Sequence, residues 1–402
     1  MSNNRIFYPV HMVAIKDNDG DLTFTPGDEV HGVQSMSMNT NFNTNQTNEL
    51  GTQTIYENVE GVPEVEVSLS KVLDGWPTPY LLSTQAAVAP TLIARSAVRC
   101  TIGAAIFPDT NTNSSGTFET AVAISGAYVD SVSYNFSTDG NFTEDTTFVA
   151  NDKLWYKTSI TGTPDYNETD LKTNLPVINF SAAIPLVDAP LATIGIATSQ
   201  DFNFDVAATA SGLDSNGAVN DADTTVMPTE IAGFSISGTN EKDGNGNYSA
   251  HVSSFSASVS LSREDISELG RRGPYFRNAT FPVEVTSELQ ATASEGDLVS
   301  ALEFGILGTG EGTCSSDNVN TRDRTIRANI CDGTRLYLGV RNRLQSVGYS
   351  GGDADGGNVT ISYTYTNYND FTVMHENDPA YDYGGVGLGP FQWSDRFTYL
   401  QE

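Results

Sequence analysis

Several short stretches of the chain have residue types that can bind a metal ion. The stretch DNDGD at 17–21 spaces its acids like a calcium loop. An EF-hand loop requires Gly at its sixth position and Glu at its twelfth, whereas here Gly20 is fourth and Asp28 is twelfth. A β-turn accounts for Asp and Gly equally well, and we interpret 243–247 and 353–357 in the same way. The sequence therefore favours turns over metal sites.

No other residues have the spacing that catalysis requires. The four histidines, at 11, 31, 251 and 375, are scattered without metal-ligand or triad spacing. The stretch GTGEG at 308–312 lacks the Lys-Ser/Thr that would follow in a phosphate-binding loop. Pairs of acids are frequent because the whole chain is acidic, so they indicate no glycosidase. We expect neither an enzyme nor a bound cofactor.

Charge is the strongest chemical signal, and it distinguishes two similar phrases. ELGRRGPYFRN at 268–278 is rich in arginine, and ELGTQTIYENVE at 49–60 has acids instead. Complementary charge would fix register and partner in a head-to-tail contact. The alternative is that both are solvated loops. The charged residues in and near these stretches are Arg263, Arg271, Arg272 and Arg277 around the later one, and Glu57, Glu60 and Glu64 around the earlier one.

The two phrases belong to a longer internal repeat. Glu49-Leu50-Gly51 matches Glu268-Leu269-Gly270 at an offset of 219 residues, and Tyr56 matches Tyr275 at the same offset. Farther on, VSYNFSTDGNFT at 132–143 matches ISYTYTNYNDFT at 361–372 at an offset of 229. Both matches occur in the same order, so we predict a duplicated domain.

The repeated phrases have the periodicity of strands. Val132, Tyr134 and Phe136 alternate with polar residues, which is typical of a half-buried antiparallel sheet. STDGN at 137–141 predicts a hairpin turn. Short helices are expected only within 84–98 and 286–304. The predicted fold class is therefore all-β, with two tandem units.

Composition changes divide the chain into four parts. We predict a first domain over 1–157, a loop-rich insert or linker over 158–228, a second domain over 229–375, and an aromatic tail over 376–402 that docks on its own or a neighbouring subunit.

Overall composition excludes several classes of protein. The formal charge of −30, with 50 acidic and 20 basic residues, argues against neutralising the phosphates of nucleic acid. Three cysteines form no disulfide framework; Cys314 and Cys331 are able to pair, but free buried thiols are favoured. The chain shows neither a signal peptide nor a run of about 18 apolar residues, so we expect no secretion and no membrane span.

The run from Val30 to Gly75 and its weaker repeat over 254–288 resemble phage tail tube proteins, as does the hairpin region over 132–155. The resemblance covers about half of the chain and has no catalytic signature. It implies β-sandwich or half-barrel units with a flanking helix. In similar proteins, the inner strands of such units join into a closed β-barrel, and stacked rings form a hollow tube for DNA.

The resemblance also implies roles for particular residues. Those expected at contacts between subunits are Glu49, Leu50, Gly51, Tyr56, Glu57, Glu60, Glu64, Arg263, Glu268, Leu269, Gly270, Arg271, Arg272, Tyr275 and Arg277. Those expected to face an acidic lumen are Asn39, Asn41, Glu66, Ser68, Ser133, Asn135, Ser137, Asp139, Ser362, Thr364 and Thr366.

The expected partners are those of a tail. A two-unit chain predicts homotrimeric rings of pseudo-six-fold symmetry, with six-chain rings as the alternative. A sheath, a tape measure protein and a tail terminator are further expected partners; DNA passes through without specific binding. The expected location is the virion, after assembly in the host cytoplasm. The competing functions are another tail, neck or baseplate ring component, or a secreted carbohydrate-binding β-sandwich.

Overall fold

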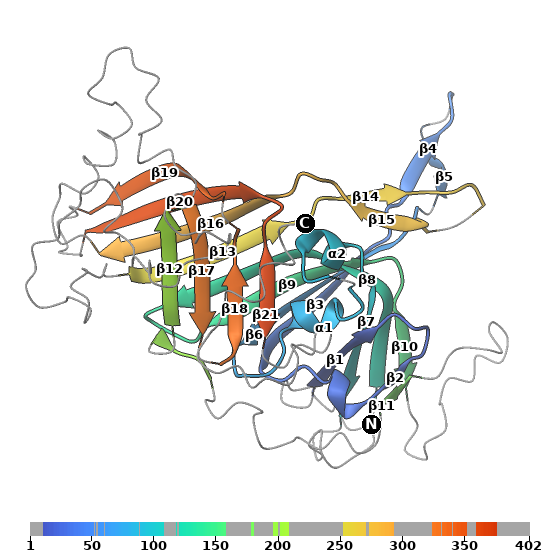
Figure 1. The fold of residues 1–402 in the computed structure, drawn as a ribbon. Coiled ribbons are helices and arrows are strands. Elements are labelled where there is room, and N and C mark those ends of the chain that lie inside the picture. Colours follow the sequence, from blue (N-terminus) through green and yellow to red (C-terminus); the bar gives the residue numbers. More distant parts are fainter. Residues whose placement is uncertain are drawn as a thin grey trace, which may run out of the picture.

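The protein has an all-β fold with a few short helices (Figure 1). The computed structural model describes residues 11–107, 118, 120–157, 178–180, 196–199, 202–208, 252–270, 273–292, 324–330, 332–339, 341–351 and 359–375, apart from 52, 54, 60 and 88. The short helices are α1 (Pro79–Ser83), α2 (Leu92–Ser96) and the 3-10 turn η2 (Pro26–Asp28).

A continuous path of eight antiparallel strands runs through the molecule from β19 to β3. In spatial order these strands are β19 (Arg343–Ser350), β20 (Thr360–Tyr368), β16 (Glu284–Thr292), β13 (Val252–Ser260), β8 (Thr120–Ser137), β9 (Thr143–Ala150), β6 (Glu64–Val72) and β3 (Val33–Asn41). Four come from residues 11–157, here called the first half, and four from residues 202–375, the second half. The two halves meet where β13 pairs with β8.

Each half adds a second set of four strands. In the first half the order is β1 (His11–Asp17), β7 (Cys100–Ile106), the beginning of β8, and β10 (Leu154–Lys157). In the second half the order is β12 (Phe202–Ala208), β17 (Arg324–Ile330), β18 (Thr334–Tyr337) and β21 (Thr372–His375). The two-residue strands β2 (Thr23–Phe24) and β11 (Asn179–Phe180) pair beside the first set.

The halves agree in strand order and in register. The path β3-β6-β9-β8 of the first half corresponds to β13-β16-β20-β19 of the second. Between β3 and β6 the register shifts at Val33/Ser35, and between β13 and β16 it shifts at Val252/Ser254, which is 252 − 33 = 219 residues later. Shifts at Val129/Ser131 in β8 and at Leu344/Ser346 in β19 correspond in the same way. Bulges are specific features of a fold, so this agreement goes beyond a shared periodicity.

The predicted strand alternation is confirmed at the centre of the sheet. Val132, Tyr134 and Phe136 of β8 are buried. The Phe136 ring stacks on Phe255 of β13 with centroids 5.9 Å apart, and it meets Phe142 edge to face at 5.1 Å. One hydrophobic core therefore continues across the junction between the halves.

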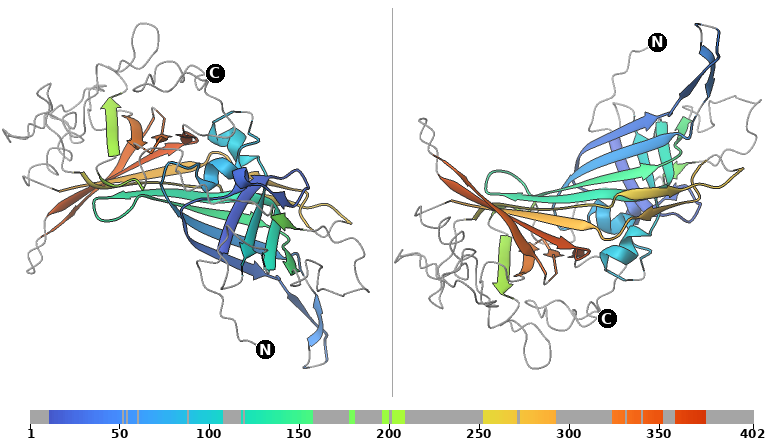
Figure 2. Two further views of the ribbon diagram at one scale, coloured as in Figure 1. Left: turned by 90° about the horizontal axis from the view of Figure 1, so that it is seen from below. Right: turned by 90° about the horizontal axis from the view of Figure 1, so that it is seen from above.

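Each half extends a hairpin arm between its first two central strands. The first arm is β4 (Asn45–Asn48) and β5 (Ile55–Val59); the second is β14 (Arg263–Ile266) and β15 (Phe276–Ala279). Equivalent backbone bonds close their bases, Gly61 N–H to Asn43 O at 3.1 Å and Thr280 N–H to Ser262 O at 3.2 Å. Figures 1 and 2 show the first arm projecting from the body of the molecule, whereas the second lies beside α2 and β8.

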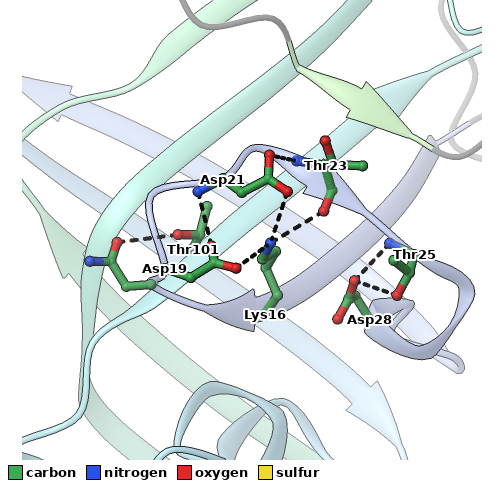
Figure 3. A network of polar contacts seen from close by, with 8 residues as sticks. Lys16, Asp19, Asp21, Thr23, Thr25, Asp28 and Thr101 are labelled. Atoms are coloured by element: carbon green, nitrogen blue, oxygen red, sulfur yellow. Dashed lines mark hydrogen bonds and ion pairs between the residues drawn. The ribbon is translucent and has the colours of Figure 1, made fainter.

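The turn at 17–21 is organised by a lysine (Figure 3). The ammonium of Lys16 lies 3.0 Å from the carboxylate of Asp19 and 3.9 Å from that of Asp21, and it donates a hydrogen bond to Thr23 O at 3.3 Å. The hydrogen bond from Lys16 is the main reason that the pKa of Asp19 is lowered. The carboxylates of Asp19 and Asp21 are therefore paired with the ammonium group of Lys16. Among the described residues, no group of three or more His, Cys, Asp or Glu has a metal-binding arrangement.

The structure corrects three predictions. Residues 202–208 lie in the predicted linker over 158–228 but form β12, which pairs with β17. The phrase at 361–372 was matched to 132–143, but β20 takes the place of β9 and not that of β8. The helix predicted over 286–304 is wrong for 286–292, which belong to β16.

The remaining sequence predictions have different outcomes: some are confirmed, and some concern residues that the structure does not describe. The helix expected in 84–98 is limited to α2, and α1 precedes the predicted range. The turn at 137–141 is confirmed between β8 and β9, with Gly140 at φ +119°. Cys100 is free and buried. Cys314, Cys331 and the tail over 376–402 lie outside the described residues.

Replacing Glu29 with Gln tests the cost of a buried carboxyl group. Burial raises the pKa of Glu29 to about 7, and its Oε2 has no hydrogen-bond partner. Because the folded-state pKa lies above the unfolded value, the folded state holds the proton more tightly, and stability falls as pH rises from 4.5 to about 7. E29Q removes this titration. We expect the wild type to lose about 2 kcal/mol more than E29Q between pH 4.5 and pH 8.

Urea unfolding of both proteins at the two pH values measures this difference. Equal pH dependence of the two free energies of unfolding would show that Glu29 titrates normally.

Candidate assembly surfaces

Arg263 fastens the base of the second arm to the first half of the chain. Its Nε donates to Val129 O at 2.7 Å, its Nη2 to Ser96 O at 2.9 Å and its Nη1 to Arg277 O at 3.2 Å. The guanidinium also lies over the ring of Tyr128, 4.8 Å from the centroid. Burial lowers the pKa of Arg263 to about 10. This side chain therefore connects α2, β8 and β15.

Arg277 makes a second contact between the halves. It is 4% exposed, and its Nη1 lies 3.4 Å from Oε1 of Glu64, the first residue of β6. Its Nε lies 3.2 Å from Oδ1 of Asp265, within ion-pair range but outside hydrogen-bond geometry. The charge complementarity expected between subunits for Arg263 and Arg277 is thus used inside one chain. Arg277 is buried and Arg263 is partly buried in these contacts within the chain, and their assignment to a contact between chains stays a prediction.

These arginines line an open pocket on the central sheet with a volume of about 380 Å³. Four carboxylates and two guanidinium groups face it, which gives a formal charge of −4 + 2 = −2 when all are ionised. Burial raises the pKa of Asp130, and the two arginines oppose that shift. The lining residues are Asn39, Asn41, Glu64, Glu66, Asp130, Val149, Arg263, Asp265 and Arg277. The pocket therefore brings together residues predicted for the lumen and for the interface.

The ELG phrases form the tips of the two arms. Gly51 and Gly270 have φ values of +97° and +85°, a region that glycine enters without strain. The leucines before them are fully exposed, at 102% for Leu50 and 106% for Leu269. The phrase recurs because each hairpin reverses direction through a left-handed glycine. Of the other predicted interface residues, Glu49, Tyr56, Glu57, Glu268 and Tyr275 belong to these arms, whereas Glu60, Arg271 and Arg272 lie outside the described residues.

The arms differ in what they contact. Phe276 of the second arm meets Tyr128 of β8 edge to face, with centroids 5.7 Å apart. Every residue of β4 and β5 in the first arm is exposed, including Ile55 and Val59. The base of the second arm is therefore docked on the first half of the chain, whereas its tip and the whole first arm are exposed.

The predicted lumen residues share one face of the central sheet. Across β20, β16, β13, β8 and β9, one register row reads Thr364, Glu288, Ser256, Asn135 and Thr143. The opposite face is the core. Also on the polar face are Asn39, Asn41, Glu66, Ser68, Ser133, Ser137, Ser362 and Thr366, whereas Asp139 lies in the turn between β8 and β9. Serine, threonine and acidic side chains dominate this surface.

Both ends of the eight-strand path are open within the described part of the chain. β3 pairs with β6 and β19 pairs with β20, each on one side only. β3 contains no charged residue, and β19 contains one, Arg343. Charged side chains and proline normally protect such edges from pairing with another strand. β3 therefore lacks a charged residue or proline, and β19 has Arg343 alone.

Sequence reasoning missed several residues at the junction. Ser96 and Val129 take part through backbone oxygens, which any residue has. Asp265 faces Arg277 across β14 and β15, and the alternating charges of that hairpin were the available signal. Asp130 occupies the β8 bulge, which no sequence pattern indicated.

Comparisons with known proteins give matches among solved structures. No family model matches, and no curated protein matches either. Among solved structures, the chain is similar to a chain of the sheath–tube complex of an extracellular contractile injection system, at 13% identity and a TM-score of 0.29, covering 39% of this chain and 95% of that one. It is also similar to the tube-terminating cap of the anti-feeding prophage, at 15% identity and a TM-score of 0.30, covering 39% and 95%.

A third similar structure is the sheath/tube terminator of the extracellular contractile injection system, at 14% identity and a TM-score of 0.29, covering 39% of this chain and 99% of that one. Within the described residues, no helix combines the length and hydrophobicity needed to cross a bilayer.

Replacing Arg263 with Ala tests the junction between the halves. The change leaves the buried oxygens of Ser96 and Val129 without their donor, so we expect a loss of about 2–4 kcal/mol in the free energy of unfolding. Arg263→Lys should recover little, because one ammonium does not span three carbonyl groups in the way a guanidinium does.

Urea denaturation provides the measurement. The exposed Arg99→Ala serves as control and should cost no more than about 0.5 kcal/mol. If R263A costs as little as R99A, Arg263 does not hold the halves together.

Proposed function

We propose that the chain is a structural subunit of a phage-type tail tube, in which rings stack into a hollow conduit for DNA. The observation that carries this proposal is the repeated sheet. Two halves with the same strand order and the same bulges are joined edge to edge, through β13 and β8. A junction of this kind generates a ring when it is repeated between chains.

The proposed ring contains three chains and six similar halves, with six chains per ring as the alternative. Equivalent edges support this arrangement, because β3 and β19 occupy the positions in their halves that β13 and β8 occupy at the inner junction. A closed ring removes both open edges, which would otherwise remain free to pair indiscriminately. The two tandem tube units proposed here correspond to residues 1–157 and, with β12 included, residues 202–375.

The polar face of the central sheet is proposed to line the lumen. Serine and threonine hydroxyl groups there are interspersed with the carboxylates of Glu66, Asp145 and Glu288. Such a surface repels phosphates of like charge, so DNA passes without binding. A tail sheath, a tape measure protein and a tail terminator are the proposed partners, in a virion assembled in the host cytoplasm.

Negative-stain electron microscopy of the purified chain tests the proposal. Hollow striated filaments are expected, and their rotational symmetry distinguishes three chains per ring from six. Single closed rings would favour a terminator or neck component. A monomer that persists at high concentration over a range of salt would overturn the proposal.

The exposed tips are proposed as contacts between subunits. The double change Leu50→Asp with Leu269→Asp should leave folding unchanged, because both side chains are fully exposed. If assembly buries both leucines, losing them raises the concentration needed for filaments at least about tenfold. Sedimentation measures that concentration. Ile93→Asp, at an exposed position of α2, is the matched control, and assembly of the double variant at the wild-type concentration would exclude the tips.

A further inference from the structure

The junction inside the chain is a template for the junction between chains. It has two parts: β13 pairs with β8, and the second arm docks beside it through Arg263, Arg277 and Phe276. The open edges β3 and β19, with the first arm next to β3, are the corresponding elements at the ends of the molecule. The inference that these edges form a contact rests on the proposed function, because it requires chains to associate side by side.

We propose that β3 of one chain pairs antiparallel with β19 of a second copy, with Thr40 opposite Val347, and that Glu57 of the first arm then contacts Arg343 of that copy.

The pairing register is derived from the matched bulges. Val33 of β3 corresponds to Val252 of β13, an offset of 219, and Ser131 of β8 corresponds to Ser346 of β19, an offset of 346 − 131 = 215. At the inner junction, Val259 lies opposite Val132 and Ala257 opposite Tyr134. Applying the offsets places Thr40 opposite Val347 and Met38 opposite Tyr349.

The side chains at these edges fit that pairing. Met36, Met38, Leu344 and Val347 are partly buried and already pack against the core, and Tyr349 is 52% exposed. At the inner junction the corresponding pairs are Val259 opposite Val132 and Ala257 opposite Tyr134. Pairing of the edges would continue the apolar core from one chain into the next and satisfy the open backbone groups of both strands.

The charged contact is derived from the registers of the two arms. Thr47 lies opposite Glu57 in the first arm, as Ile266 lies opposite Phe276 in the second, again at an offset of 219. Glu57 thus corresponds to Phe276. Phe276 contacts Tyr128, the residue before the β8 bulge at Val129/Ser131. Arg343 is the residue before the β19 bulge at Leu344/Ser346, so it corresponds to Tyr128 at the offset of 343 − 128 = 215. An aromatic pair inside the chain is therefore replaced by a glutamate–arginine pair between chains.

A second correspondence supports the same arrangement. Arg277 corresponds to Asn58 at the offset of 219, and Glu64 corresponds to Glu284, since each is the first residue of its strand. The ion pair of Arg277 with Glu64 inside the chain, which is half-buried, would become a hydrogen bond from the Asn58 amide to the Glu284 carboxylate. The two junctions would then share geometry and differ in chemistry, so chains bind each other without competing for the inner junction.

Disulfide trapping tests the register. The variant Thr40→Cys with Val347→Cys is prepared with Cys314 and Cys331 replaced by Ser; Cys100 is buried and is retained. Directly opposite residues have Cα atoms about 4.5–5.5 Å apart, within the range for a disulfide. Oxidation of assembled protein should give covalently linked oligomers on a non-reducing gel. The pair Thr40→Cys with Tyr349→Cys, shifted by two residues, is the control, and equal cross-linking by both pairs would overturn the register.

Charge reversal tests the arm contact. Glu57→Arg and Arg343→Glu should each raise the concentration needed for assembly at least about threefold, which is the order expected for one exposed ion pair. The variant carrying both changes should return to the wild-type value. Asp152→Arg makes the same change of charge at an exposed turn and should have no effect. If E57R and R343E behave like D152R, the contact is wrong.

These outcomes separate the inference from the proposed function. A wild-type chain that never associates contradicts both. Tubes that form without cross-linking at Thr40 and Val347 contradict the inference alone. Both charged side chains are exposed in the monomer, and a cooperative thermal unfolding transition of each single variant confirms that it folds.

Discussion

The pairing of β13 with β8 is the contact on which the rest of the molecule depends. It converts two four-strand sheets into one path of eight, and it brings Phe255 against Phe136 so that a single core spans both halves. Without this pairing, the four-strand sheet of each half would have two open edges, and the edge strands would have unpaired N–H and C=O groups. The same physical requirement applies to the strands at the ends of the path, β3 and β19, and it is the basis for the proposed association of chains.

The differences between the arms depend on where each contact forms. Burying a guanidinium costs several kcal/mol unless its donors are satisfied. The guanidinium of Arg263 donates hydrogen bonds to three carbonyl oxygens, which offset the cost of its burial. These oxygens take their positions once, when the chain folds. A contact that forms between separate molecules has to desolvate its groups at each encounter. Neutral or exposed residues such as Asn58 and Glu57 reduce that cost, which gives a physical reason for the absence of arginine from the first arm.

The sequence predicted those features that local backbone requirements control. The repeated ELG phrase was expected in loops, and it forms both arm tips, because Gly51 and Gly270 need positive φ values that other residues adopt only with strain. Alternation identified the core face of β8. It did not identify neighbours: β20 resembles β8 in pattern, but the counterpart of β8 is divided into β18 and β19, with Gly339 between them at φ +75°. Two strands of equal periodicity are indistinguishable until pairing partners are known.

The partners of the arginines lay beyond sequence reasoning for a related reason. Charge complementarity between the arms was visible, but whether it joins two chains or two halves of one chain depends on how far the second arm reaches. Arg277 reaches Glu64, 277 − 64 = 213 residues earlier, only because β13 pairs with β8 and not with a neighbouring molecule. A repeat with internal complementarity therefore favours the contact within the chain, where the effective concentration of the partner is highest. Among the described strands the edges left over are β3 and β19, which are the edges proposed to bind a second copy.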